Sequence, residues 1–239
     1  MSESMKHSIY ILTIFVACSL VGCHPQLDIQ GETSLPELEG RTLYLRVFEN
    51  GDLQAKDSAS IIHGKFQFSG PQMDSTVMAI LFLEDKSLMP IVVEDCPLTV
   101  TLNETLRRVK GSALNDTLFT FIQRKTVLDE QLAELPRRES QMILNGMDHD
   151  EILRRLNQEA MVLQAQEDEL VMRFIKDNME NALAPGVFMI VTSNLPYPML
   201  NPSIEELVAL GSPRFLNDAY VKEFLKLARE NMEKINEEQ

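Results

Sequence analysis

Cysteine thiols are the side chains of this sequence that could take part in covalent chemistry, as lipid acceptors, redox nucleophiles or metal ligands. The chain of 239 residues has three of them, Cys18, Cys23 and Cys96. Disulfide exchange needs both an attacking and a resolving thiol, and the sequence has no Cys-x-x-Cys. The cysteines therefore predict lipid attachment and one free thiol rather than a redox centre.

Cys23 stands at the end of a segment typical of a bacterial lipoprotein signal. Lys6 precedes an apolar run over residues 9–18, which is the basic start and short hydrophobic core of a secretory signal. The residues that follow resemble a lipobox, in which a small residue gives the signal peptidase access and a thiol accepts the lipid. They are Leu20, Val21, Gly22 and Cys23. We predict a signal peptide over residues 1–22 and a lipidated Cys23; a plain signal peptide or an uncleaved anchor is the alternative.

The predicted lipid anchor and the net charge indicate which kinds of partner the protein could bind. Buried acyl chains contribute about 0.8 kcal/mol per CH₂, so the expected partner at the N-terminus is a membrane. We expect a bacterial cell-envelope protein, most simply on the outer membrane facing the periplasm. The chain has 22 Lys and Arg against 36 Asp and Glu, a formal charge of −14. Such a surface repels phosphates, which argues against a nucleic-acid partner.

Cys96 is the candidate free thiol of the mature chain. It follows Glu94 and Asp95 and precedes Pro97, and neighbouring carboxylates disfavour the thiolate. We therefore predict a raised pKa and a residue that belongs to a turn. A mixed-disulfide or sensor role for this thiol is the alternative.

No other group of residues has the spacing of a catalytic or metal-binding motif. His63 and His149 belong to no His-x-x-x-His pair of the kind that binds zinc. The acidic runs 148–151 and 167–169 lack the glycine and distal glutamate of a calcium loop, and instead fit a helix start and a solvated helix face. Ser112 lies outside any Gly-x-Ser-x-Gly setting. We predict no catalytic residues, no metal and no cofactor, and expect that the protein is not an enzyme.

Short strands fill the first half of the mature chain, up to about residue 110. Apolar residues that alternate with polar ones, or that stand in short consecutive runs, predict strands over 42–48, 58–62, 65–70, 76–83, 90–94 and 98–102. Asn50-Gly51 and His63-Gly64 are typical of hairpin turns, and 95–97 predicts a third turn. We predict an antiparallel β-sandwich or barrel in an α+β protein.

Helices fill the second half of the chain. Ser112 is a candidate N-cap, and apolar residues then recur at helical spacing until Pro136, which is expected to interrupt the helix. Asp148 has the spacing of a capping box for a second long helix. Lys125 and Glu167 are polar breaks in the two apolar stripes. We predict a long antiparallel helical hairpin, followed by shorter helices over 184–192, from 202, and from about 217 to the C-terminus.

The strand half resembles the domain of unknown function 4369, the N-terminal module of thiol-disulfide lipoproteins of the TlpA/ResA type. The stretches that carry the resemblance are 43–45, 57–59, 62–70, 90–94, 98–100 and 111–115, with 174–178 and 186–188 resembling the helical segment that follows. In such lipoproteins a thioredoxin-like domain with Cys-x-x-Cys comes next. The sequence has neither, so the resemblance implies an anchor, a β module and a helical linker without the redox activity.

The expected organisation is therefore a signal over 1–22, a sandwich-like module over 23–111 and a helical region over 112–239. We expect a non-catalytic binding or scaffold module with a protein partner, and an accessory to thiol-disulfide lipoproteins is one form that this role could take. Two alternatives stay open. One is a lipoprotein that holds a hydrophobic or peptide ligand between the sandwich and the helices, and the other is a thiol accessory that uses Cys96.

Overall fold

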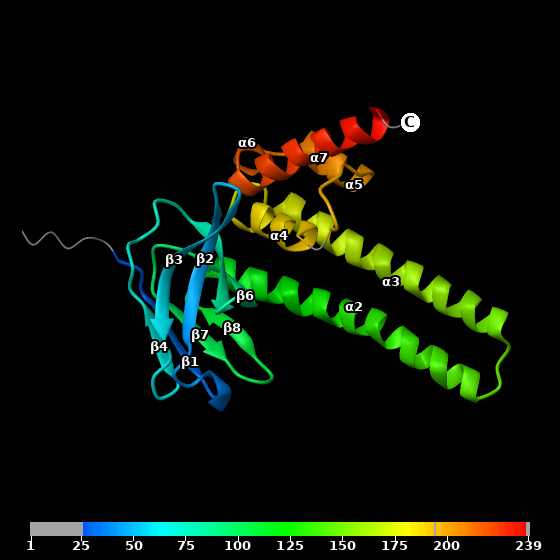
Figure 1. Cartoon of the computed structure of the whole chain (residues 1–239), viewed down its shortest axis with the longest axis horizontal. Helices are drawn as coiled ribbons and strands as arrows, with labels where there is room; N and C mark the ends of the chain where they lie inside the picture. Colours follow the sequence, from blue (N-terminus) through cyan, green and yellow to red (C-terminus); the bar gives the residue numbers. More distant parts are fainter. Residues whose placement is uncertain (1–25, 194, 238–239) are drawn as a thin grey trace, which may run out of the picture.

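A computed structural model describes residues 26–193 and 195–237 of the chain. The protein is α+β, with two four-stranded sheets followed by a helical region (Figure 1). The predicted signal peptide and lipobox lie outside the described residues. The strands are β1 (Ile29–Thr33), β2 (Thr42–Glu49), β3 (Asp52–Ser60), β4 (Lys65–Phe68), β5 (Val77–Leu83), β6 (Lys86–Val93), β7 (Leu98–Leu102) and β8 (Arg107–Lys110). A short 3₁₀ helix, η2 (Pro36–Leu38), joins β1 to β2.

The two sheets bury one apolar core between them. One sheet has the order β4-β1-β7-β8 and the other has the order β3-β2-β5-β6. Strand β2 shows why the sequence folds this way, because its alternate residues Leu43, Leu45 and Val47 are buried and a strand turns successive side chains to opposite faces. The largest fully buried side chains of this core are Ile29, Leu43, Leu45, Ile61, Phe68, Leu81, Ile91, Leu98 and Leu102.

The predicted hairpin turns are confirmed, and one part of the predicted topology is wrong. Asn50 and Gly51 both have positive φ, 53° and 84°, as do His63 and Gly64, 53° and 72°. These values suit the tight turns that match the twist of a hairpin. The sheets are not wholly antiparallel, because β1 pairs in parallel with β7 from Ile29↔Leu98 onward. Parallel partners need a long connection, and strands β2 to β6 provide it.

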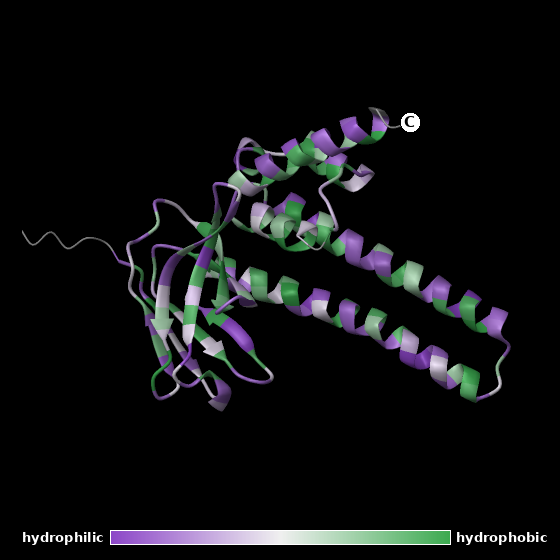
Figure 2. Cartoon of the chain, in the orientation of Figure 1, coloured by the Kyte–Doolittle hydropathy of each residue, from purple (hydrophilic) through white to green (hydrophobic). Residues whose placement is uncertain are grey.

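The helical region consists of a long hairpin and a cap of shorter helices. The hairpin helices are α2 (Ala113–Leu144) and α3 (His149–Asp177), and the others are α4 (Leu183–Thr192), α5 (Pro202–Leu210), α6 (Pro213–Leu216) and α7 (Ala219–Glu237). In Figure 1 the hairpin extends away from the sandwich, and the chain enters the sandwich on the side far from the hairpin. Figure 2 shows polar and apolar residues interspersed along both hairpin helices, as expected for an exposed amphipathic pair.

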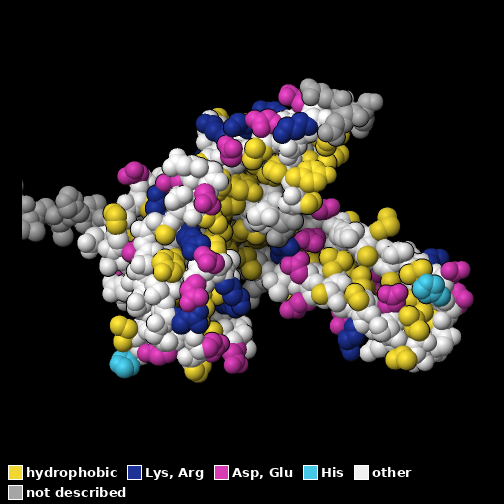
Figure 3. All heavy atoms as spheres, in the orientation of Figure 1, with side chains coloured by type: hydrophobic (Ala, Val, Ile, Leu, Met, Phe, Trp, Pro, Cys, Tyr) yellow, Lys and Arg dark blue, Asp and Glu magenta, His cyan; other side chains and the backbone are white. Residues whose placement is uncertain are grey.

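The hairpin has a small core of its own along the facing stripes. Leu135, Ile152, Leu156 and Leu163 are buried there. Ser112 and Asp148 are the N-caps of the two helices, as predicted, and their side chains accept backbone N–H groups of the first turns. Toward the turn of the hairpin Ile143 and Leu144 stay exposed, at 52% and 85%, and Figure 3 shows hydrophobic side chains on this outer part.

The predicted interruption at Pro136 is wrong, because α2 continues through it to Leu144. Proline lacks the N–H that would bond one turn back. The neighbouring Leu135 is nevertheless buried against α3, so packing across the hairpin outweighs the local penalty.

Replacing Pro136 by alanine should stabilise the protein by about 1–3 kcal/mol, because it restores one helical hydrogen bond and removes a clash. Thermal unfolding followed by circular dichroism would measure the gain. Gln141→Ala, in the same helix and exposed, is the control and should change the stability little. An unchanged or lower melting temperature for Pro136→Ala would contradict this reading of the helix.

A buried asparagine attaches the hairpin to the sandwich. Asn115, in the first turn of α2, is 2% exposed. Its Oδ1 accepts the backbone N–H of Val92 at 2.9 Å, and its Nδ2 donates to the Val92 carbonyl at 2.8 Å. Strand β6 is an edge strand, so this amide takes the place of a neighbouring strand for one residue.

Candidate binding cleft

Cys96 lies where the sequence predicts, in the turn between β6 and β7. It is partly buried, and its Sγ donates a long, weak hydrogen bond to the Gly111 carbonyl at 3.7 Å. Burial raises the pKa of the Cys96 thiol, and the charges of Glu94 and Asp95 raise it further. The predicted direction of the shift is confirmed, but desolvation contributes more than the two carboxylates.

Iodoacetamide should therefore alkylate Cys96 slowly near neutral pH, because only the thiolate reacts and a raised pKa lowers its fraction. The pH at which the alkylation rate is half-maximal should lie above that of a cysteine in an unfolded peptide. Glu94→Gln should lower that midpoint, whereas the distant Glu205→Gln should not. An alkylation midpoint below the unfolded value would indicate an activated thiol instead.

The other candidate residues are spread over the surface. His63 is exposed in the β3–β4 turn, and His149 begins α3. No group of three or more His, Cys, Asp or Glu side chains within the described ranges could hold a metal ion. No helix in the described part of the chain has both the length and the apolar character needed to span a membrane.

The two polar breaks in the hairpin stripes meet each other. Lys125 Nζ lies 2.6 Å from Glu167 Oε1, and 2.7 Å from Asp129 Oδ1 on its own helix. Burial alone would lower the pKa of Lys125, but the two carboxylates outweigh it and the pKa is raised. The sequence identifies Lys125 and Glu167 as polar residues within the apolar stripes, but it does not show that they form an ion pair. In an antiparallel hairpin the two positions lie opposite each other, which is consistent with the pairing.

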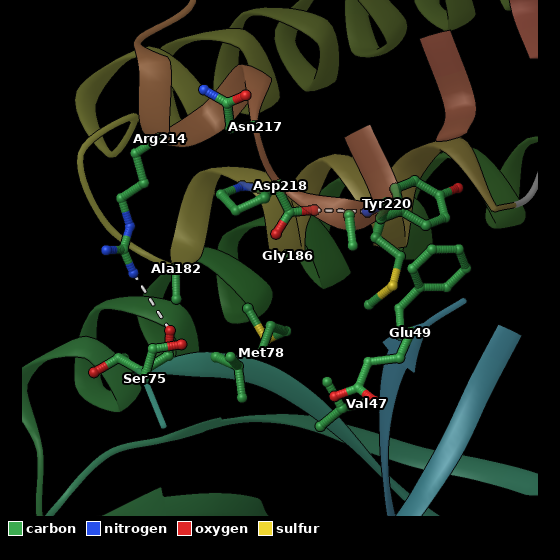
Figure 4. Close-up of a pocket in the computed structure, with 16 residues that line it drawn as sticks. Val47, Glu49, Ser75, Met78, Ala182, Gly186, Arg214, Asn217, Asp218 and Tyr220 are labelled. Atoms are coloured by element: carbon green, nitrogen blue, oxygen red, sulfur yellow. Dashed lines mark hydrogen bonds between the residues drawn. The ribbon is translucent and has the colours of Figure 1, made fainter. Parts of the chain in front are cut away.

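A cleft opens where the sandwich meets the helical cap. It has a volume of about 450 Å³, which is within the range of small-molecule sites. Its sandwich wall comes from β2, the 75–76 loop and β5, and its helical wall comes from α4, α6 and the start of α7. Figure 3 shows hydrophobic side chains gathered around α4, where the helices meet the sandwich, and Figure 4 shows the cleft itself.

The floor of the cleft is apolar and tightly packed. Met78 of β5 lies against Gly186 of α4, where a Cβ would meet the Met78 Cβ and Cγ at 2.7 Å. The glycine thus lets α4 approach the sheet. Val47, Ala182 and Met189 complete the buried part of the floor.

Charged and aromatic side chains form the rim. Arg214 reaches across from α6 and donates to the Thr76 carbonyl at 3.3 Å. The rings of Phe48 and Tyr220 meet edge to face with centroids 4.9 Å apart, and the Tyr220 hydroxyl lies 2.9 Å from Thr192 Oγ1. These contacts join the sandwich to the cap on both sides of the cleft.

Asp218 is a partly buried carboxylate on this rim. Its Oδ1 accepts the N–H groups of Tyr220 and Val221 at 2.9 and 3.3 Å, which is the geometry of an N-cap for α7. Burial raises the pKa of the Asp218 carboxyl, against the opposing effects of these two hydrogen bonds and of Arg214. Such a partly desolvated carboxylate in a cleft is typical of binding sites.

Sequence reasoning missed the cleft residues. The residues of β2 and those of α6 and α7 lie more than 160 positions apart along the chain, and no local pattern links them. The one available signal was the position of Asp218 just before an amphipathic helix, which indicates a cap rather than a site.

Two further cavities lie along the hairpin. One, of about 390 Å³, is enclosed by α2, α3, α4 and α5 and includes the Lys125–Glu167 pair. The other, of about 590 Å³, runs between α2 and strands β6 and β8. The cleft differs from both in that one wall comes from the sandwich and the other from the helical cap.

Two packed sheets joined to a helical cap, with a cleft at their junction, define an α+β protein. Residues 27–118 match the family model described as "Domain of unknown function (DUF4369)", and this segment is therefore a DUF4369 domain. The match includes the first turn of α2 and hence Asn115. No curated protein and no solved structure matches the chain.

Proposed function

We propose that the protein is a lipid-anchored binding module of the bacterial cell envelope that holds a ligand without transforming it. The observation that carries this proposal is the cleft, since both halves of the chain contribute walls to it and its polar groups surround an apolar floor. A ligand seated there would contact the sandwich and the cap together.

Native mass spectrometry of the protein purified from its own membranes tests the binding role. Wild-type protein should carry a bound small molecule, and Ala219→Trp should lose it, because Ala219 lies exposed on the cleft rim and a large ring there would fill the cleft. Ala133→Trp, exposed on the hairpin, is the matched control and should keep the ligand. Equal occupancy in all three proteins would contradict a role for the cleft.

The anchor rests on the lipobox that ends at Cys23. In cells fed a labelled fatty acid, the wild-type protein should incorporate the label and sediment with membranes. Cys23→Ser should lose both properties, whereas Cys96→Ser should keep them. Labelling that survives Cys23→Ser would contradict lipidation at this site. Separation of inner and outer membranes would test the proposed outer-membrane location.

A role as an accessory to thiol-disulfide lipoproteins is the second candidate function. The resemblance of the strand half to the N-terminal module of these lipoproteins favours it, and the exposed Ile143 and Leu144 offer an apolar contact. A photo-crosslinker at Leu144 should capture a thioredoxin-like lipoprotein in living cells, and one at the exposed Gln164 should not. Identification of no thioredoxin-like adduct would contradict this role.

A further inference from the structure

The cleft presents free hydrogen-bond acceptors beside its apolar floor. Both N-cap hydrogen bonds of α7 go to Oδ1 of Asp218, and no donor among the described residues bonds its Oδ2. Glu49, at the end of β2, uses Oε2 for Lys56 Nζ at 2.6 Å, which leaves Oε1 without a partner in the described part of the chain. Figure 4 shows both carboxylates on the cleft, one from each wall.

Among the described residues that line the cleft, Arg214 carries the guanidinium, and one of its nitrogens is bonded within the protein. Arg214 Nη2 donates to the Thr76 carbonyl, and Figure 4 shows the side chain extended along one wall toward the 75–76 loop. One of the five N–H donors of Arg214 is thus used within the protein, and its charge acts on Asp218. Oδ2 of Asp218 and Oε1 of Glu49 accept from no donor among the described residues. A ligand that brings hydrogen-bond donors complements this arrangement.

Aromatic rings and burial add to the preference for positive charge. Phe48 and Tyr220 line the cleft, and aromatic faces attract cations. The desolvation that raises the pKa of Asp218 shows that its charge is incompletely compensated, and a bound cation would compensate it. A bare metal ion does not fit, because the described residues include no group of three or more suitable ligands.

Building on the proposed binding function, we propose that the cleft binds an organic cation, a primary ammonium group carried on an apolar or aromatic body. The ammonium group lies against Asp218 and donates to its free Oδ2, with the carboxylate of Glu49 on the opposite wall of the cleft. The body of the ligand lies on Met78, Ala182 and Met189, with its edge toward the ring of Phe48. The cation is neither hydrolysed nor oxidised; it is held.

Three probes of one shape and different charge test this proposal: phenethylammonium, 2-phenylethanol and 3-phenylpropanoate. Calorimetric titration uses the full chain in lipid nanodiscs, with empty nanodiscs as the blank. Phenethylammonium should bind about tenfold more tightly than the alcohol, which is the value of a charge-assisted hydrogen bond in a partly desolvated site. The carboxylate should bind most weakly.

Matched variants separate the cleft from the overall negative charge of the protein. Asp218→Asn should bring the affinity for phenethylammonium down about tenfold, to the level of the alcohol, while asparagine still caps α7. Glu49→Gln should lower it about threefold, because this carboxylate is more exposed and shared with Lys56. Glu205→Gln, an exposed acid on α5 outside the cleft, should leave it unchanged.

Several results would overturn the proposal. Equal binding of the amine and the alcohol, preference for the carboxylate, or equal effects of Asp218→Asn and Glu205→Gln would each do so. A native ligand that is lost in Ala219→Trp but proves anionic or neutral would refute the organic cation and leave the binding function intact. Absence of any cleft-dependent ligand in both experiments would refute both proposals.

Discussion

Asn115→Leu should lower the free energy of unfolding by about 3–5 kcal/mol, the largest loss we expect from a single polar residue of this chain. Leucine is similar in size but cannot bond the N–H and carbonyl of Val92, both of which the asparagine now satisfies. Each buried backbone group left without a partner costs about 1–3 kcal/mol. Urea unfolding followed by circular dichroism would measure the loss.

Asn157→Leu is the control for this experiment. Asn157 also lies inside a hairpin helix, but it is exposed, and its replacement should change stability by no more than about 0.5 kcal/mol. A similarly small change for Asn115→Leu would mean that the edge of β6 does not depend on the amide. Asn115→Asp would add a second comparison, because it keeps the acceptor and loses the donor to the Val92 carbonyl.

Gly111→Ala should be destabilising by at least about 3 kcal/mol, because two costs add at this residue. Gly111 joins β8 to the cap of α2 with φ of 114°, a conformation that side chains rarely adopt. A Cβ there would also overlap the carbonyl oxygen of Pro97 and lie 3.3 Å from the Leu98 Cα. Backbone atoms of β7 cannot move aside without breaking its pairing with β1.

Gly146→Ala separates the two costs. Gly146, in the turn of the hairpin, also has positive φ, 74°, but no atom lies within 4 Å of the position of its Cβ. Its replacement should cost about 1 kcal/mol for the backbone conformation alone. The difference between the two variants in free energy of unfolding, measured with urea, gives the cost of the overlap at Gly111. Equal losses would show that small shifts of the neighbouring atoms remove the overlap.

The fold could be predicted where its cause is local. Asn50-Gly51, the alternation of β2 and the caps Ser112 and Asp148 act over a few residues, and all four are present as expected. The expected interruption at Pro136 is absent because the rule that proline ends a helix is local, whereas the continuity of α2 is determined by its packing against α3. The parallel pairing of β1 with β7 depends on residues almost 70 positions apart, and no sequence period reports such a partner.

The cleft could not be predicted, for a related reason. Its groups come from β2, β5 and three helices, so it exists only through the docking of the cap on the sandwich. Asp218 and Glu49 are ordinary acidic residues in an acidic sequence, and only their placement on one cleft distinguishes them. The signal and lipobox, by contrast, are continuous motifs that sequence reasoning finds without the fold.

The place where the chain enters the sandwich sets what the hairpin can reach. Gln26 lies three positions after Cys23, a span of about 10 Å at full extension. An acylated Cys23 would thus keep the sandwich close to the bilayer. The hairpin leaves the opposite side (Figure 1), and α2, with 32 residues, is about 48 Å long. Its outer turn would therefore sample the aqueous space well beyond the lipid headgroups.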